Sequence, residues 1–195
     1  MQIEKIRLRH VFGTIETDGL FWEERLVQPL DIYQEFSDVT KRVEWSSQKS
    51  PNELSHDAYF VQIETDEGVV GIAGPMDKAI AFIIDNELSK YLIGRDPLAI
   101  EFLWDIMHRG SVHGRQGNTM IAISALDNAL WDLKGRYFNT PVYSIIGGPT
   151  RQEVPAYASM LGYHVLDMGL VRDCLLYTSD AADEGLGVDL GGRRI

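Results

Sequence analysis

Residues 117–148 constrain the fold of this chain more than any other stretch. They read GNTMIAISALDNALWDLKGRYFNTPVYSIIGG. Apolar residues recur at steps of three and four along the first half, a period typical of an amphipathic α-helix. The residues of this stripe are Ile123, Leu126, Leu130 and Leu133. The spacing predicts a long helix that buries one face, followed by a short apolar run and a glycine turn.

Both ends of the predicted helix carry boundary signals. Asn118 or Thr119 can cap its start, because each offers a side-chain oxygen to the first free backbone N–H groups. Gly135 or Asn139 can end it, since both residue types adopt the left-handed conformation that closes helices. Pro141 then prevents continuation of the helix.

The composition excludes several classes of function. The 195 residues are 45% hydrophobic, which is enough for a sizeable core. The net charge is −11 and no run of Lys or Arg occurs, so nucleic acid and membranes are not expected partners. The charged start MQIEKIRLRH lacks the apolar core of a signal peptide. Cys174 is the only cysteine, and we therefore expect a cytoplasmic protein without disulfides.

The order of the remaining elements predicts an α+β domain. Residues 3–12 alternate between apolar and charged side chains, with Ile6, Leu8 and His10 on one face, as in a half-exposed strand. Residues 58–65 and 69–73 flank an Asp-Glu-Gly turn and predict a hairpin. Strands that precede helices, rather than alternating with them, indicate a three-stranded antiparallel sheet followed by a helical bundle.

Two further helices are expected before the long one. Residues 77–91 place Ile80, Ile83, Ile84 and Leu88 on one face. Asp96 is expected to cap the next helix, with Pro97 at its first position and Gly110 at its end. Together with the long helix, these segments complete the predicted bundle.

Residues 13–56 form an unusually long connection without a sustained period. The segment contains GLFWEERLVQPLDIY and several aromatic residues among Gly, Pro, Asp and Ser. Connections of this length within a compact domain are usually functional or disordered, and the aromatic content argues against simple disorder. We therefore expect residues 13–56 to carry function.

Few residues predict chemistry by themselves. His108 and His113 lack carboxylate or thiol neighbours at ligand spacing, so they do not favour a zinc site. Asp127 and Asp132 stand five apart on the long helix and face different directions, which suits capping or ion pairing better than acid and base catalysis. No dinucleotide-binding or serine-hydrolase motif occurs.

The segment SALDNALWDLKGRYFNTPVYSIIGG resembles the signature of the enolase superfamily, in its mandelate racemase and muconate lactonising enzyme branch. The positions that match are Asp127, Ala129, Leu130, Trp131, Asp132, Gly135, Pro141, Val142, Gly147 and Gly148. The resemblance covers about residues 1–173. It implies a capping domain at residues 1–150 that leads into a (β/α) barrel, whose first strand and helix begin within residues 151–173.

The resemblance also implies a reaction and a metal. Members of this branch abstract the proton α to a carboxylate, and Mg²⁺ stabilises the enediolate that forms. The base and the metal ligands lie on later barrel strands, so no catalytic or metal residue is assigned to this chain. Within the long connection, Trp22, Arg25 and Tyr33 are candidate substrate contacts: Arg25 for a carboxylate or hydroxyl, Trp22 for excluding water. The alternative is that Trp22 anchors the loop and Arg25 is solvated.

Residues 174–195 resemble a translated sequencing adapter rather than a natural protein tail. Two adapter-like parts, CLLYTSDAADE and VDLGGRRI, stand in one frame with a gap of about the length of a sample index. We therefore leave this tail out of the fold prediction, expect it to be disordered, and expect the natural protein to continue beyond Asp173. The alternative is an ordinary acidic, Gly-rich tail.

Within this branch, the pattern most resembles members that dehydrate acid sugars. The resemblance therefore implies the N-terminal part of a Mg²⁺-dependent acid-sugar dehydratase, itself inactive and binding no metal. The expected partner of the complete enzyme is a small carboxylate, a sugar acid, and a homo-oligomer is expected. Three alternatives stay open: a racemase or cycloisomerase of the same superfamily, a stand-alone binding module that uses the aromatic loop, and a metagenomic truncation without function of its own.

Overall fold

The computed structural model describes residues 1–16, 29–37, 48–50 and 52–155. The chain divides into two compact units. The first comprises residues 1–13 and 56–150 and holds most of the sheet and the long helices; the second comprises residues 14–55 and 151–195. The predicted barrel helix and the tail lie outside the described residues, as does most of the predicted strand at 154–161.

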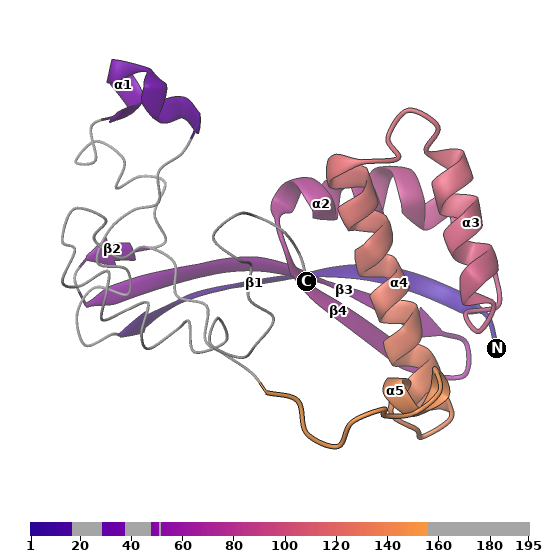
Figure 1. Ribbon diagram of the computed structural model, residues 1–195. Helices are drawn as coiled ribbons and strands as arrows, with labels where there is room; N and C mark the ends of the chain where they lie inside the picture. The colour runs from indigo at the N-terminus through magenta and orange to yellow at the C-terminus, as the bar shows by residue number, and fades with distance from the viewer. Residues whose placement is uncertain (17–28, 38–47, 51, 156–195) are drawn as a thin grey trace, which may run out of the picture. The chain divides into compact units, whose positions relative to one another are not determined.

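The sheet is built around β3 (Glu53–Thr65). Strand β1 (Ile3–Glu16) pairs with one side of β3, while β4 (Val70–Met76) and the short β2 (Gln48–Ser50) pair with the other (Figure 1). The β3–β4 register is antiparallel and places Val61 opposite Ala73. The three predicted antiparallel strands are confirmed and are longer than expected, and β2 adds a fourth strand too short to show a period.

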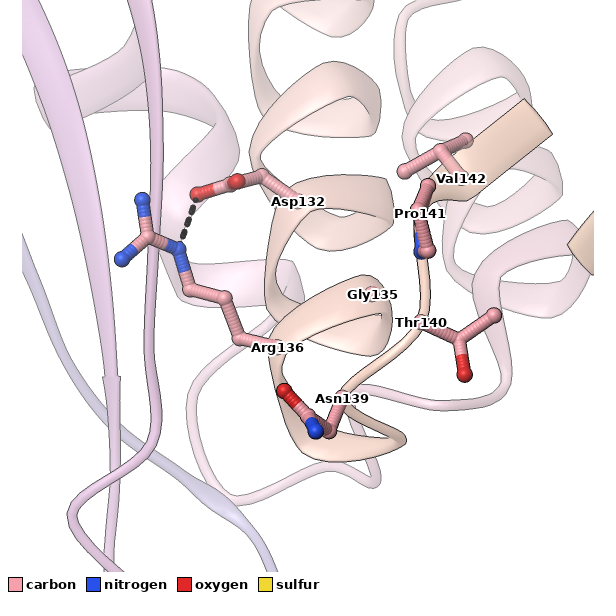
Figure 2. Close-up of a pocket in the computed structure, with 7 residues that line it drawn as sticks. All are labelled: Asp132, Gly135, Arg136, Asn139, Thr140, Pro141 and Val142. Atoms are coloured by element: carbon pink, nitrogen blue, oxygen red, sulfur yellow. Dashed lines mark hydrogen bonds and ion pairs between the residues drawn. The ribbon is translucent and has the colours of Figure 1, made fainter. Parts of the chain in front are cut away.

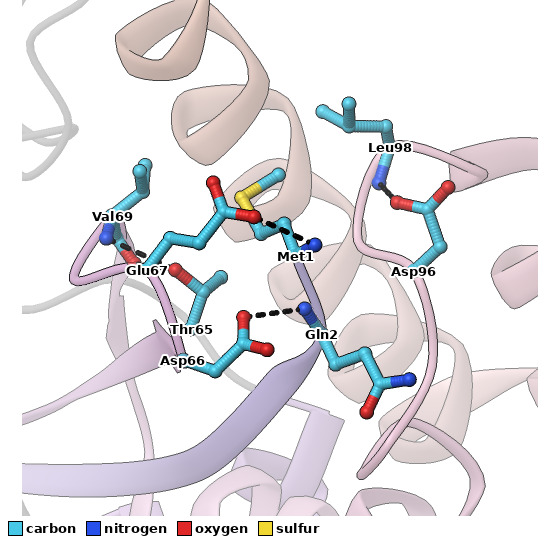
Figure 3. Close-up of polar contacts among 8 residues, drawn as sticks. All are labelled: Met1, Gln2, Thr65, Asp66, Glu67, Val69, Asp96 and Leu98. Carbon is cyan, nitrogen blue, oxygen red and sulfur yellow. Dashed lines mark hydrogen bonds and ion pairs between the residues drawn. The ribbon is translucent and has the colours of Figure 1, made fainter.

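The turn between β3 and β4 holds the start of β1 through hydrogen bonds and an ion pair (Figure 3). The Asp66 backbone N–H donates to the Gln2 carbonyl at 3.1 Å, and the Gln2 N–H donates to Asp66 Oδ1 at 2.7 Å. The Met1 amino group lies 2.8 Å from Glu67 Oε1. Gly68 has a φ of +80°, which an Asp-Glu-Gly turn supplies without strain. The predicted hairpin turn therefore also sets the β1–β3 alignment.

The helical segment after β4 is continuous but not uniform. It comprises α2 (Lys78–Ile83), a π turn η3 (Ile84–Leu88) and a 3₁₀ turn η4 (Ser89–Tyr91). Ser89 Oγ donates to the Ile84 carbonyl at 2.7 Å and so satisfies a carbonyl where the winding changes. The segment covers the predicted range, and Ile80, Ile84 and Leu88 are buried as the stripe requires.

Helix α3 (Ile100–Gly110) starts later than predicted and ends where expected. Asp96 Oδ1 accepts from the Leu98 N–H at 2.9 Å, and the Asp96 carbonyl accepts from the Ala99 N–H at 3.3 Å. These bonds close a separate turn, so the prediction of Asp96 as the cap of this helix is wrong. The short side chain of Asp96 stabilises its own local turn instead.

Helix α4 (Gly117–Tyr137) is the predicted long helix, and all four residues of its stripe are fully buried. The predicted caps are wrong, because Asn118 and Thr119 lie inside the first turn and Gln116 precedes it without a side-chain bond. The predicted end at Asn139 is confirmed. Asn139 has a φ of +48°, and the Thr140 N–H donates to the Gly135 carbonyl at 2.9 Å, which closes the helix before α5 (Val142–Ile145).

Helices α2, α3 and α4 lie on one side of the sheet (Figure 1), and the core fills the space between. The approach of α4 to β4 depends on Gly71. A Cβ at Gly71 would collide with the Ala129 carbonyl oxygen and lie 2.6 Å from Leu133 Cβ. Buried side chains of this core include Ile3, Val61, Ile63, Ile84, Leu103, Met107, Leu126 and Leu130.

Within the described residues, no helix combines the length and apolar character that crossing a membrane requires.

Candidate functional site

The three predicted substrate contacts are not brought together by the described structure. Trp22 and Arg25 lie outside the described residues. Tyr33 lies between η1 (Pro29–Ile32) and α1 (Gln34–Ser37), and its side chain is 54% exposed. The assignment of these three residues therefore stays a prediction.

A pocket of about 400 Å³ opens beside the last turns of α4 (Figure 2). Asp132 and Arg136 lie along one side of the helix in this view, and Thr140, Pro141 and Val142 lie along the other. Gly135 lies between the two sides without a side chain. The hollow therefore exists because α4 ends in a glycine-containing turn and the chain reverses at Asn139.

The carboxylate of Asp132 is engaged within the fold. Its Oδ2 accepts from Arg136 Nε at 2.9 Å and from the Ile72 backbone N–H at 2.8 Å. Ile72 belongs to β4, whose outer edge is not paired with another described strand. Asp132 thus caps one free N–H of an edge strand and forms the predicted ion pair, and both roles are structural.

The pocket has binding groups but no reactive ones. Arg136, whose side chain is 57% exposed and bonds to Asp132 through Nε, and the Asn139 amide both line it. Thr140 Oγ1 donates to the Phe138 carbonyl at 3.0 Å. Among the residues lining the pocket, none is a nucleophile held by a base, so this arrangement can hold a small polar group but does not provide catalysis.

Asp127 differs from Asp132 although both lie on α4. It is half-buried and forms no hydrogen bond or ion pair with any described residue. Burial raises the pKa of the Asp127 carboxyl, and the negative charge of Glu101 raises it further. The prediction that Asp127 serves in capping or ion pairing is therefore wrong for the part of the chain that the structure covers.

The two histidines near the α3–α4 loop do not form a metal site. The His108 ring stacks on Trp104 at 4.7 Å, and its backbone carbonyl accepts from Arg115 Nε at 3.2 Å. In residues 1–16, 29–37, 48–50 and 52–155, no group of three or more His, Cys, Asp or Glu side chains could hold a metal ion. These residues do not fit a Mg²⁺ site, and no catalytic step through a metal is assigned to them.

A histidine–carboxylate pair on the sheet was missed from the sequence. His10 Nε2 lies 2.8 Å from Asp57 Oδ1, and the His10 ring stacks on Tyr59 with centroids 4.5 Å apart. Phe12 lies beside His10 at 5.1 Å. The signal that could have found this group is the alternation of side chains, which places His10 and Phe12 on one face of β1, and Asp57 and Tyr59 on one face of β3.

Comparison with known proteins identifies the family. The profile of the mandelate racemase / muconate lactonizing enzyme N-terminal domain matches residues 40–147, more than half of the chain. The chain therefore belongs to this family, and its α+β fold of an antiparallel sheet covered by helices agrees with the capping domain that the resemblance implied.

Individual relatives point to enzymes of the same superfamily. The chain is 43% identical, over 102 residues, to D-galactonate dehydratase of Cronobacter sakazakii (strain ATCC BAA-894); the match covers 51% of this chain and 27% of that protein. The 3,6-anhydro-D-galactonate cycloisomerase of Zobellia galactanivorans superposes with a TM-score of 0.60 at 27% identity, covering 91% of this chain and 40% of that one.

A third relative shows what such an enzyme has been seen to bind. An enolase from Agrobacterium radiobacter, solved with bound sodium and L-malate, superposes with a TM-score of 0.50 at 28% identity. The match covers 77% of this chain and 29% of that one. The chain thus spans between about a quarter and two fifths of the length of these three relatives.

Proposed function

We propose that this chain is the capping domain of a Mg²⁺-dependent acid-sugar dehydratase. The complete enzyme removes the proton α to the carboxylate of a sugar acid and then eliminates water from the neighbouring carbon. The observation that carries the proposal is the 43% identity to D-galactonate dehydratase over 102 residues. The L-malate bound to the Agrobacterium relative supports a carboxylate as the ligand class.

In this proposal, the chain supplies substrate recognition rather than chemistry. The capping domain corresponds to residues 1–150, and residues 13–56 close over the substrate. Arg25 pairs with a carboxylate or hydroxyl, Trp22 excludes water from the closed site, and Tyr33 is a further substrate contact. The α-proton of a carboxylate is too weakly acidic to be removed without stabilising the dianion that forms, and Mg²⁺ supplies that stabilisation when bound. The setting we propose is a cytoplasmic homo-oligomer.

A second candidate is a cycloisomerase of the same family. The cycloisomerase from Zobellia galactanivorans matches the fold over 91% of this chain. Both reactions begin with the same proton abstraction, so the capping domain alone does not distinguish them. The difference lies in whether water leaves or a ring opens.

The test is an assay of the complete enzyme with D-galactonate and 3,6-anhydro-D-galactonate in D₂O. Dehydration gives a product that has lost water and contains a keto group, which mass spectrometry and carbonyl derivatisation detect. Cycloisomerisation gives a product with the mass of its substrate apart from solvent deuterium. Racemisation exchanges the α-proton for deuterium without either change. Turnover without loss of water from any sugar acid would refute the dehydratase proposal.

Arg25→Ala tests the substrate contact in the same assay. We expect a loss of about 2–3 kcal/mol in transition-state binding, roughly 30- to 150-fold in kcat/KM, because a charge-assisted hydrogen bond is lost from a closed site. The matched control is Arg109→Ala, since Arg109 forms only an exposed pair with Asp105 on α3. Unchanged kinetics together with a lower melting temperature would mean that Arg25 anchors the loop.

A further inference from the structure

The helix-side face of the β1–β3 ladder extends past the helices that cover it. Along β3, Val61 and Ile63 are fully buried, Tyr59 is half-buried and Asp57 is exposed. Along β1, the side chains on the same face become steadily more exposed from Leu8 to His10 and Phe12. We name His10, Phe12, Asp57 and Tyr59 the outer strip. All four lie in the unit that holds the helices.

Within the outer strip, the His10 ring has a fixed orientation. Its Nε2 donates to Asp57 Oδ1 at 2.8 Å, and its face lies nearly parallel to the Tyr59 ring, 9° from coplanar. In the neutral imidazole, the carboxylate acceptor places the ring proton on Nε2, and Nδ1 is then a hydrogen-bond acceptor. Nδ1 has no partner among the described residues, and the side chain is 40% exposed. The strip therefore presents an oriented acceptor beside Phe12, a 74% exposed aromatic ring.

The same two strands carry a second cross-strand pair that lacks these features. Arg7 Nε lies 2.6 Å from Glu64 Oε1 on the opposite face of the sheet. Glu64 Oε1 also accepts from Gln62 Nε2 at 2.8 Å, and Gln62 Oε1 accepts from Arg9 Nε at 3.1 Å. These polar groups bond to one another along the strands, as in an ordinary exposed sheet surface. Arg7–Glu64 is thus an internal reference for a purely structural pair.

In the amino-acid sequence, the outer strip borders the segment to which we assign substrate recognition. Strand β1 leaves the first unit after Gly13, and β3 enters it at His56, so residues 14–55 begin and end next to the strip in the chain. An aromatic ring next to polar acceptors is suited to a polyhydroxylated ligand. The ring packs against C–H groups, while an imidazole acceptor receives a hydroxyl.

We propose that His10 is a specificity-determining residue whose Nδ1 accepts a hydrogen bond from a hydroxyl of the sugar acid. Asp57 is its positioning residue, because it holds the ring through Nε2. Phe12 packs against the carbon chain of the same ligand. This inference rests on the proposed function of the complete enzyme, and it adds a contact outside residues 14–55.

Two substitutions of His10 separate ligand contact from structure. Asparagine places an amide near the position of Nδ1, whereas glutamine reaches the position of Nε2 and keeps the bond to Asp57. In the complete enzyme, we expect His10→Gln to lower kcat/KM about 10-fold, as for loss of one hydrogen bond, and His10→Asn to lower it less than about threefold. Arg7→Gln is the control and should leave kcat/KM unchanged.

A larger loss of kcat/KM for His10→Asn than for His10→Gln would overturn the inference. If His10→Asn is the more damaging variant, the residue acts through Asp57 alone, and if both variants match the Arg7 control, it has no role in recognition. Melting temperatures of all three variants show whether a loss of activity reflects unfolding.

A binding readout keeps this result separate from the proposed function. Calorimetric titration of the complete enzyme and its variants with D-galactonate measures Kd without turnover. If no dehydration occurs but His10→Gln weakens binding about 10-fold relative to His10→Asn, the dehydratase proposal fails and the recognition role of His10 stands. If the wild-type enzyme neither binds nor converts D-galactonate, the inference is overturned as well.

Discussion

The inner and outer halves of the β1–β3 ladder share the same strands but have different surroundings. In the inner half, Val61 and Ile63 are fully buried beneath the helices. In the outer half, His10, Phe12 and Asp57 continue the same face in contact with solvent. The sequence alternation continues through both halves, so the strand pattern alone does not distinguish them. The two halves are distinguished by the extent of the helix layer, which covers the inner half and not the outer half.

This difference separates stability from recognition. Burial of apolar side chains is the main source of folding free energy, at roughly 25 cal/mol per Å² of apolar area, so substitutions in the inner half should affect unfolding most. The outer half contributes little burial, and its ordered side chains are free to contact a ligand. One pair of substitutions tests this division, and two further substitutions test the polar contacts of α4.

Gly71→Ala should have the largest effect, because α4 packs directly on β4 at this residue. The added Cβ would meet the Ala129 carbonyl oxygen, and backbone cannot move aside as a side chain can. We expect a loss of more than about 3 kcal/mol in the free energy of unfolding, measured by urea denaturation. Gly13→Ala is the matched control in the outer half, where no atom of the described residues lies within 4 Å of the added Cβ. If both substitutions lowered the free energy of unfolding equally, the inner and outer halves would not differ in their contribution to stability.

Asp132→Ala should have an intermediate effect. It removes the ion pair with Arg136 and leaves the Ile72 N–H at the edge of β4 without its partner. We expect a loss of about 1–2 kcal/mol in the free energy of unfolding, since Ile72 is partly exposed and water can replace the lost bond. Asp105→Ala is the control, because its pair with Arg109 has the same i,i+4 spacing but no backbone partner. A control loss as large as that of Asp132→Ala would show that the β4 edge bond contributes nothing.

Asp127→Asn should have the smallest effect on stability. The direction of the change in melting temperature is what tests the assignment. Burial raises the pKa of the Asp127 carboxyl above its usual range, so the folded state holds this proton more tightly than the unfolded state. The Asp127 carboxyl therefore lowers stability as pH rises through its folded pKa, whereas asparagine keeps a neutral side chain throughout. We expect the variant to melt at a slightly higher temperature than wild type at pH 7, and the difference to vanish at pH 3. A difference independent of pH, or a less stable variant at pH 7, would contradict the assignment.

Local patterns in the sequence predicted the backbone elements well where periodicity was strong. The buried stripe of α4 and its end at Asn139 follow from side-chain spacing and from residues that favour a left-handed conformation. The starts of α3 and α4 were predicted poorly. Residues such as Asn118 and Asp96 can satisfy backbone groups in more than one local arrangement, and packing selects among them.

The sequence by itself determined the strand alternation, the hairpin turn, the α4 stripe and a motif specific enough to indicate the family. Only the tertiary structure decided that Asp132 reaches the Ile72 N–H and that His10 meets Asp57. It also decided that Asp127 is half-buried without a partner in the part of the chain that the structure describes. Periodicity reports which face of an element is apolar, and this information is local. Which polar groups meet depends on strand register and on where a covering helix ends, and both are set by contacts between residues far apart in the chain.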